Sequence, residues 1–295
     1  MDPLRVLFLE SFFGGSHAAF AEGYRAHSRH QIDLHTLPGR EWRRRQRLAG
    51  WYFAETCSAG AYDVVLTSDL LNLADFKAAQ PRNRPVPPMV LYMHETQCTY
   101  PLPSGKSHNA EMVFFDVKNC CFADAVVFNS CTHRDTFLQA IEPWLAKVTE
   151  IDGARRHAEI RQKADVVYPG VDIPAARGAS TRQAESTRDA TGTQDAAPTI
   201  VWNHRWEYDK NPPAFFRAIE RLADAGLDFR LIILGENPRN RPTEFEEAHR
   251  RFADRVRHYG YASSRRRYLE LLALGDVVVS TAVQENFGIA TVEAI

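Results

Sequence analysis

The stretch that most constrains this chain is residues 276–293. The apolar run 276–280 is short and β-branched with polar residues at its ends, which is typical of a buried strand. A loop with Glu285 follows, and Gly288 then precedes an apolar segment that predicts a helix. On one straight helix Glu285 and Glu293 would be about 12 Å apart along the axis. With Glu285 in the loop and Glu293 on the second helical turn, the two carboxylates can hold two parts of one extended ligand. A surface loop glutamate and an exposed helix glutamate are the alternative.

Composition limits the possible classes of function. The 295 residues suggest two domains, and 44% hydrophobic with 25% charged residues is typical of a soluble globular protein. The formal net charge of -1 gives no overall basic field, so an RNA partner would have to bind local patches. No apolar run approaches the roughly 20 residues of a membrane span, so we expect no membrane partner and no signal peptide.

The five cysteines include no Cys-x-x-Cys pair, which argues against a disulfide or zinc framework. We therefore expect a reducing compartment and a cytoplasmic location. His94 and Cys98 have a spacing that a metal site could use, but no further ligands cluster near them, so we expect no metal.

Short apolar strands alternate with helical segments in the first half of the chain. Strands are expected at 6–9, 31–35, 63–67, 89–93, 125–128 and 165–168, and helices at 18–27 and 110–122. This pattern predicts an α/β fold, in which ligands bind at the carboxyl ends of the strands. Ser68 and Asp69 could cap the helix that follows the third strand.

Polar and glycine residues follow several of these strands. Gly14 and Gly15 would let the backbone approach a ligand closely, and His17 comes at the start of the next helix. A tight turn without a ligand is the alternative, and the absence of Gly-x-Gly-x-x-Gly disfavours a dinucleotide site. His94 could contact a transferred sugar or an acceptor hydroxyl, and Asn129 is a site residue or a helix cap.

Five arginines lie between residues 40 and 47, and aromatic residues accompany them through Phe53. Guanidinium groups beside aromatic rings suit phosphate contacts and base stacking. Arg40, Trp42, Arg43 and Arg44 are therefore candidate RNA contacts. A solvated helix face is the alternative.

Residues 175–197 are polar without apolar periodicity and predict a flexible linker between domains at 1–174 and 198–295. The second domain opens with a strand at 199–202. Arg205 and Lys210 follow in a loop before a helix at 213–225, and together with that helix they could hold a diphosphate. Two solvated cations are the alternative. Arginines 265–267 predict a solvated helix face rather than a second RNA patch.

The strand, acidic loop and glycine-opened helix at 276–293 resemble the nucleotide-sugar site of retaining glycosyltransferases of the GT-B fold. This resemblance implies two Rossmann-like domains facing a cleft, and the absence of Asp-x-Asp fits a metal-independent member. It also implies residue roles: Glu285 binds the donor sugar and Glu293 the ribose. Arg205 and Lys210 would stabilise the leaving diphosphate, with the donor also held by Gly14, Gly15, Gly235, Glu236, Phe287 and Gly288.

The resemblance narrows to the tRNA-queuosine α-mannosyltransferase family at residues 13–17, 37–43, 92–97, 128–130, 169–172 and 202–212. It implies transfer of mannose from GDP-mannose, without a cofactor, to the cyclopentene-diol of queuosine in a tRNA for aspartate, with anomeric retention. His17 or His94 would position the acceptor hydroxyl. The linker departs from the family pattern, and because the last helix has barely begun at Ile295, we expect the second domain to be truncated.

Two other classes of function stay open. A GT-B enzyme with a lipid or glycan acceptor would have a lysine-rich amphipathic face in its first domain, whereas residues 40–53 are arginine-rich and aromatic. The other is a non-catalytic module that binds a nucleotide or RNA. Activity that survives Arg205→Ala would favour it.

Overall fold

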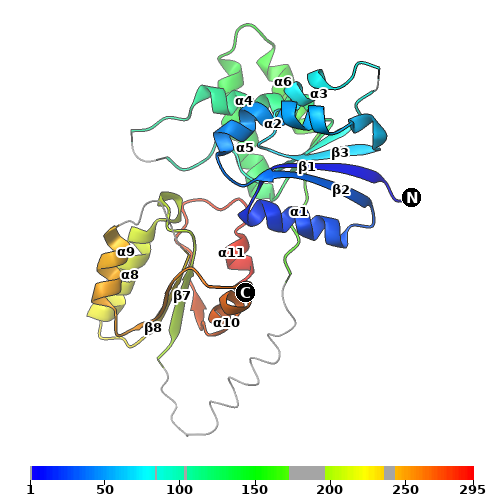
Figure 1. The fold of residues 1–295 in the computed structure, drawn as a ribbon. Helices are drawn as coiled ribbons and strands as arrows, with labels where there is room; N and C mark the ends of the chain where they lie inside the picture. The colour runs from blue at the N-terminus through cyan, green and yellow to red at the C-terminus, as the bar shows by residue number, and fades with distance from the viewer. Residues whose placement is uncertain (1, 84, 103–104, 173–196, 236–242) are drawn as a thin grey trace. The chain divides into compact units, whose positions relative to one another are not determined.

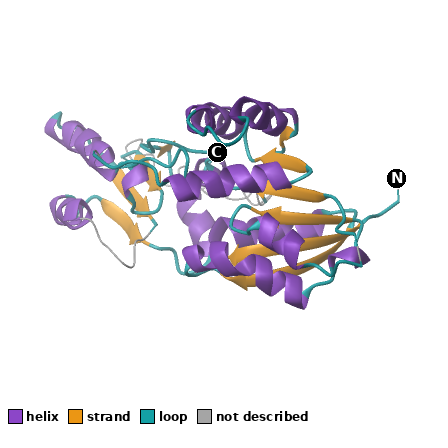
Figure 2. Cartoon of the chain, turned by 90° about the horizontal axis from the view of Figure 1, so that it is seen from above, coloured by secondary structure: helices purple, strands orange, loops and turns teal. Residues whose placement is uncertain are grey.

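The computed structural model describes residues 2–83, 85–102, 105–172, 197–235 and 243–295 (Figure 1). The chain divides into two compact units, unit 1 at Met1–Gly170 and unit 2 at Val171–Ile295. Helices and parallel strands alternate in both (Figure 2). Most of the predicted linker, and Glu236, lie outside the described residues.

Unit 1 contains a six-stranded parallel sheet in the order β2-β1-β3-β4-β5-β6. The chain moves outward from β1 to β2 and then crosses back to β3, so the strand order reverses between β1 and β3. Open α/β sheets bind ligands at such a reversal, beside the carboxyl ends of the strands. The strands are β1 (Arg5–Phe13), β2 (Gln31–Pro38), β3 (Val64–Ser68), β4 (Met89–Met93), β5 (Ala125–Phe128) and β6 (Ala164–Val166).

Helices pack on both faces of this sheet, because alternate residues of a strand point to opposite faces. Phe8 on one face of β1 meets the rings of Phe20 and Tyr24 from α1. Leu7 and Leu9 on the other face belong to the larger core. The helices are α1 (Gly15–His27), α2 (Trp42–Thr56), the 3-10 turn η1 (Ala59–Ala61), α3 (Leu73–Ala79), α4 (Ala110–Phe122), α5 (Cys131–Ala146) and α6 (Gly153–Gln162).

Unit 2 contains a four-stranded parallel sheet in the order β10-β7-β8-β9. Its core is aromatic: Trp202 and Trp206 are almost completely buried, and the Trp206 ring stacks on Phe245 at 4.2 Å. Its elements are β7 (Thr199–Asn203), the 3-10 turn η2 (Tyr208–Lys210), α8 (Pro212–Asp224), β8 (Arg230–Leu234), α9 (Thr243–Arg251), β9 (Val256–Gly260), α10 (Arg265–Ala273), β10 (Val277–Val278) and α11 (Ile289–Val292).

Most predicted elements are present, and the differences have local causes. The first strand continues to Phe13 rather than ending at Leu9, because it carries the polar Glu10 and Ser11 in buried positions. Ser68 and Asp69 do not cap the next helix. That helix is α3, and the Asn72 side chain caps it by accepting the Asp75 amide. Among the described residues, none of the helices has the length and apolarity required to cross a membrane.

Gly50 marks a close contact between α2 and α3. A Cβ atom at Gly50 would lie 2.7 Å from the Asn72 carbonyl oxygen, whereas a Cβ at Gly23 in α1 would meet nothing within 4 Å. Glycine to alanine inside a helix normally stabilises by about 0.5–1 kcal/mol. We expect that gain for Gly23→Ala, and a loss of about 1–3 kcal/mol for Gly50→Ala because the helices must move apart. Chemical denaturation of both variants measures this, and equal stability of the two would contradict the packing.

Candidate active site

The first polar cluster of unit 1 lies where the strand order reverses. Glu10 at the end of β1 is completely buried, and its Oε1 accepts hydrogen bonds from the Ser68 hydroxyl at 2.9 Å and the Phe12 amide at 2.8 Å. The Nδ1 atom of His17, in the first turn of α1, lies 3.3 Å from both carboxylate oxygens. Glu10 thus joins β1, β3 and α1 at the edge where ligands bind.

His17 is a cation in this setting. Burial lowers its pKa, but the hydrogen bond to Glu10 and the charges of Glu10, Asp69 and Glu95 outweigh burial and raise the pKa to about 9. Burial raises the pKa of Asp69 to about 8. At neutral pH the imidazolium of His17 therefore faces the carboxylate of Glu10 as a buried ion pair.

His94 and Asn129 continue this cluster along β4 and β5. The rings of His94 and His17 lie 4.1 Å apart with a 34° tilt. Burial, and then the positive charge of His17, lower the pKa of His94, so its ring is neutral. Asn129 donates to the His94 carbonyl at 2.9 Å and lies 2.8 Å from Nδ1 of His133. Ser130, not Asn129, caps α5 by accepting the His133 amide.

Glu10, His17 and His94 are also the group of described residues whose potential ligand atoms lie close enough, within 4.8 Å of one another, to hold a metal ion. Their hydrogen bonding and charge favour a polar network instead. His17 already directs Nδ1 at Glu10, and its pKa is raised to about 9, so at neutral pH both ring nitrogens carry protons. A histidine that ligates a metal is the neutral imidazole.

The arginine-rich segment begins beside this cluster and continues into α2. Gly39 packs so closely on the Gly14 turn that a Cβ atom at Gly39 would lie 2.9 Å from the Gly14 Cα. The Arg43 guanidinium lies 4.6 Å from the centre of the half-buried Trp42 ring. Glu41 is exposed in this segment and forms an ion pair with Arg44 at 3.4 Å. The exposed basic, apolar and aromatic residues, which we call the α2 patch, are Arg40, Arg43, Arg44, Arg47, Leu48, Trp51 and Tyr52.

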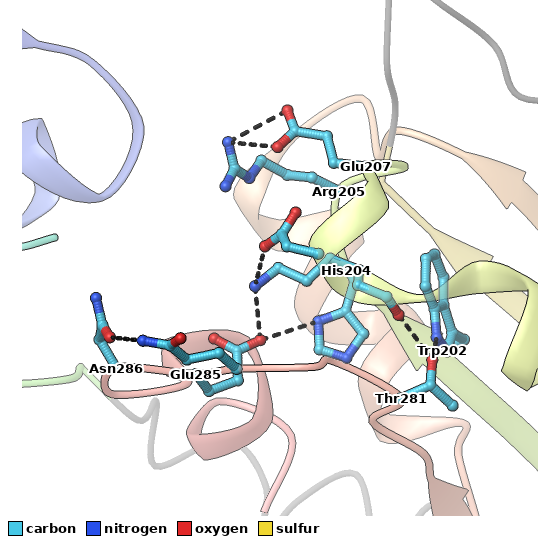
Figure 3. A network of polar contacts seen from close by, with 10 residues as sticks. Trp202, His204, Arg205, Glu207, Thr281, Glu285 and Asn286 are labelled. Carbon is cyan, nitrogen blue, oxygen red and sulfur yellow. Dashed lines mark hydrogen bonds and ion pairs between the residues drawn. The ribbon is translucent and has the colours of Figure 1, made fainter. Parts of the chain in front are cut away.

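The second cluster lies in unit 2 and contains Lys210 and Glu285. Figure 3 shows Glu285 beside His204. The Lys210 ammonium is 2.8 Å from Glu285 Oε1 and 3.0 Å from Asp209 Oδ2. Nδ1 of His204 lies 3.7 Å from the same Glu285 oxygen, and burial lowers its pKa to about 4. Since Lys210 is only 9% exposed, its interpretation as a solvated cation is wrong.

Backbone contacts hold the two halves of this second cluster together. The Val283 amide donates to the Asp209 carbonyl and the Thr281 hydroxyl to the Lys210 carbonyl, both at 2.8 Å. The Trp202 indole donates in turn to Thr281 at 3.0 Å. These bonds fasten the loop after β10 to the η2 turn, and so place Glu285 against Lys210.

Arg205 is exposed and forms an ion pair with Glu207 at 3.1 Å (Figure 3). Lys210 forms its ion pairs with Asp209 and Glu285, so both predicted diphosphate cations contact carboxylates in this structure. A diphosphate in this cluster would have to exchange with some of these carboxylates. Gly235 packs directly against the loop that follows β7, because a Cβ atom at Gly235 would overlap the His204 carbonyl oxygen.

Phe287 and Gly288 directly precede α11, and Gly288 is its N-cap with a φ of 76°. Glu293 directly follows α11. Its carboxylate contacts Arg265 at 2.6 Å, and Arg265 is exposed, as predicted for residues 265–267. Arg266 and Arg267 instead pair with Glu270 on their own helix.

The sequence did not single out Glu10, Asp209 or Tyr268 as site residues. Glu10 and Tyr268 lie within regular elements, and Asp209 stands beside the more conspicuous Lys210. The one available signal was Glu10, a charged residue directly after an apolar strand.

The ion pair of Glu10 and His17 predicts a pH dependence of stability. The pKa of His17 is raised from 6.5 to about 9 in the folded protein. Protonated His17 therefore contributes its full stabilisation below pH 6.5, and this contribution is lost as pH rises through 9. We expect His17→Gln to lower the free energy of unfolding on the order of 2 kcal/mol more at pH 6 than at pH 9.5. Urea denaturation at both pH values measures this, with Glu10→Gln as the variant that should remove the dependence. An equal loss at both pH values would disprove the ion pair.

Comparison with known proteins relates both units to glycosyltransferases. Residues 5–171 match the tRNA-queuosine alpha-mannosyltransferase N-terminal family, and residues 183–295 match glycosyl transferases group 1. The tRNA-queuosine alpha-mannosyltransferase of Drosophila melanogaster is 29% identical over 294 residues, which cover 98% of this chain and 76% of the relative. A 2-deoxystreptamine glucosyltransferase of Streptomyces kanamyceticus is 30% identical over 44% of this chain and 34% of its own length.

Solved structures show the same fold at low identity. The sucrose-phosphate synthase of Thermosynechococcus elongatus has a TM-score of 0.64 at 14% identity, covering 98% of this chain and 78% of its own. Anabaena HepE in complex with UDP and glucose has a TM-score of 0.60 at 18% identity, covering 99% and 78%. These similarities establish the α/β GT-B fold with two Rossmann-like units. Together with the family match over residues 5–171, they show that this chain is a glycosyltransferase that belongs to the tRNA-queuosine alpha-mannosyltransferase family.

Proposed function

We propose that this protein transfers mannose from GDP-mannose to the cyclopentene-diol of queuosine in a tRNA for aspartate, with retention at the anomeric carbon, in the cytoplasm. The observation that carries the proposal is the alignment to a tRNA-queuosine alpha-mannosyltransferase over 98% of the chain. Guanine, mannose and the aspartate tRNA come from the family resemblance. The two polar clusters support glycosyl transfer itself.

The cluster of Lys210 and Glu285 suits the donor. Glu285 accepts hydrogen bonds from sugar hydroxyls, while Lys210 and Arg205 exchange carboxylate partners for diphosphate oxygens. As the bond between the anomeric carbon and the diphosphate oxygen breaks, its electron pair stays on the diphosphate. Preorganised cations stabilise that charge most in the transition state.

Front-face attack accounts for retention in this proposal. The acceptor hydroxyl oxygen bonds to the anomeric carbon on the side that the diphosphate leaves, and the hydroxyl proton passes to a departing phosphate oxygen. Glu285 in this proposal accepts hydrogen bonds from sugar hydroxyls and forms no bond to the anomeric carbon. A glycosyl adduct trapped on Glu285 would contradict this step.

The cluster of Glu10, His17, His94 and Asn129 suits the acceptor. A protonated His17 donates a hydrogen bond and cannot accept a proton, so it positions the acceptor hydroxyl rather than acting as its base. The neutral ring of His94 next to it can accept or donate one hydrogen bond. Positioning of this kind contributes to the rate without covalent chemistry.

The decisive assay follows radiolabel from GDP-mannose, and separately from UDP-glucose, into total tRNA with and without queuosine. We expect label only from GDP-mannose and only in tRNA that contains queuosine. Lys210→Ala should lower the rate about 100-fold or more, since one stabilising group at the leaving charge is lost. Lys118→Ala, at an exposed position of α4, is the control and should keep full activity. Label in lipid or glycan and none in tRNA would discard the tRNA acceptor.

We propose that the α2 patch binds the tRNA backbone. Arg43, Arg44 and Arg47 lie on α2 with the exposed rings of Trp51 and Tyr52, an arrangement that suits phosphate contacts and stacking.

The combined variant Arg43→Ala, Arg44→Ala and Arg47→Ala should weaken tRNA binding and lower the slope of log Kd against log salt by about one per lost phosphate contact. GDP binding should stay unchanged. Arg155→Ala with Arg156→Ala on α6 is the matched control, because those exposed arginines pair with Glu159. Filter binding at several salt concentrations measures both variants. An unchanged slope in the α2 variant would remove the patch from the RNA site.

A further inference from the structure

The carboxylate of Glu293 is held by two side chains of α10. Arg265 Nη2 lies 2.6 Å from Oε1, and the Tyr268 hydroxyl donates to Oε2 at 2.7 Å. The side chain of Glu293 is 13% exposed. Each carboxylate oxygen thus has its own donor, which restricts rotation of a side chain that would otherwise have several rotamers.

Tyr268 is itself fixed from the opposite side. The Asn203 amide, at the end of β7, donates to the Tyr268 hydroxyl at 2.7 Å and to the Ala290 carbonyl of α11 at 3.0 Å. Burial and the hydrogen bond to Glu293 raise the pKa of Tyr268, so the hydroxyl stays protonated and donates. The Arg265 guanidinium also lies 5.0 Å from the centre of the Tyr268 ring. The network therefore ties β7, α10 and α11 to one carboxylate.

The chemistry of this carboxylate suits a vicinal diol. A carboxylate can accept about four hydrogen bonds, so being held by two donors is compatible with binding two hydroxyls. The Arg265 guanidinium lies beside the carboxylate and balances its charge. The resemblance to GT-B enzymes implies that Glu293 binds the donor ribose, and we take this donor role of Glu293 as part of the proposed function.

We propose that Tyr268 and Arg265 are positioning residues that orient Glu293 toward the donor ribose, and that the preference for ribonucleotide over 2′-deoxyribonucleotide depends on them. This inference rests on the proposed donor role of Glu293. Tyr268 and Arg265 act through that carboxylate and do not touch the reacting atoms.

The test measures Kd by calorimetry for GDP and UDP, each beside its 2′-deoxy form, on the full 295-residue chain. Wild type should prefer the ribose form of the nucleotide it binds. Tyr268→Phe and Arg265→Ala should each reduce that preference by about three- to tenfold, the value of one hydrogen bond, while Kd for the 2′-deoxy form changes little. Arg265→Lys keeps the charge and should recover part of the preference.

Arg266→Ala is the matched control, because Arg266 lies next to Arg265 on α10 but pairs with Glu270. Thermal unfolding of each variant tests for folding, and Arg265→Ala serves if Tyr268→Phe does not fold. If Tyr268→Phe and Arg265→Ala both keep the wild-type preference for the ribose form, and wild type transfers sugar to queuosine tRNA, the positioning role is overturned and the proposed function stands. Equal binding of ribose and 2′-deoxy forms by wild type overturns it together with the ribose role of Glu293. Absence of both nucleotide binding and transfer overturns the proposed function as well.

Discussion

Each unit of this protein keeps charged side chains where little water reaches them, and a buried charge is stable only when it is paired and hydrogen bonded. Glu10 is completely buried and has His17, Ser68 and a backbone amide as partners. Lys210 is nearly as buried and lies between Asp209 and Glu285. These pairs determine which side chains can face a ligand and in which protonation state.

Paired charges also place a condition on binding. A ligand that brings negative charge to Lys210 must compete with the carboxylates already in contact with it, so a diphosphate there would exchange partners rather than fill a prepared anion site. The neutral ring of His204 adds no positive charge to that cluster. In unit 1, by contrast, the charge of His17 comes from Glu10 and does not depend on a ligand.

Much of the fold was predictable because its signals are local. The strands at 89–93 and 125–128 and the helix at 110–122 have the predicted bounds, since each is a run of suitable periodicity between polar or proline-rich flanks. The family assignment was predictable as well, because motifs such as 92–97 are contiguous. The cap of α3 was missed because Ser68 and Asp69 are used elsewhere, Ser68 by Glu10 and Asp69 by the Glu95 amide.

The sequence by itself determined the alternation of strands and helices, the two parallel sheets and the candidates that follow individual strands. Only the tertiary structure decided which of those side chains pair, because the partners are far apart in the chain and meet through strand order. Lys210 and Glu285 are 75 residues apart, Glu10 and Ser68 are 58, and Tyr268 and Glu293 are 25. A local pattern carries no information on such pairs, since the hydrogen bonds and burial that set each charge form only when distant strands become neighbours.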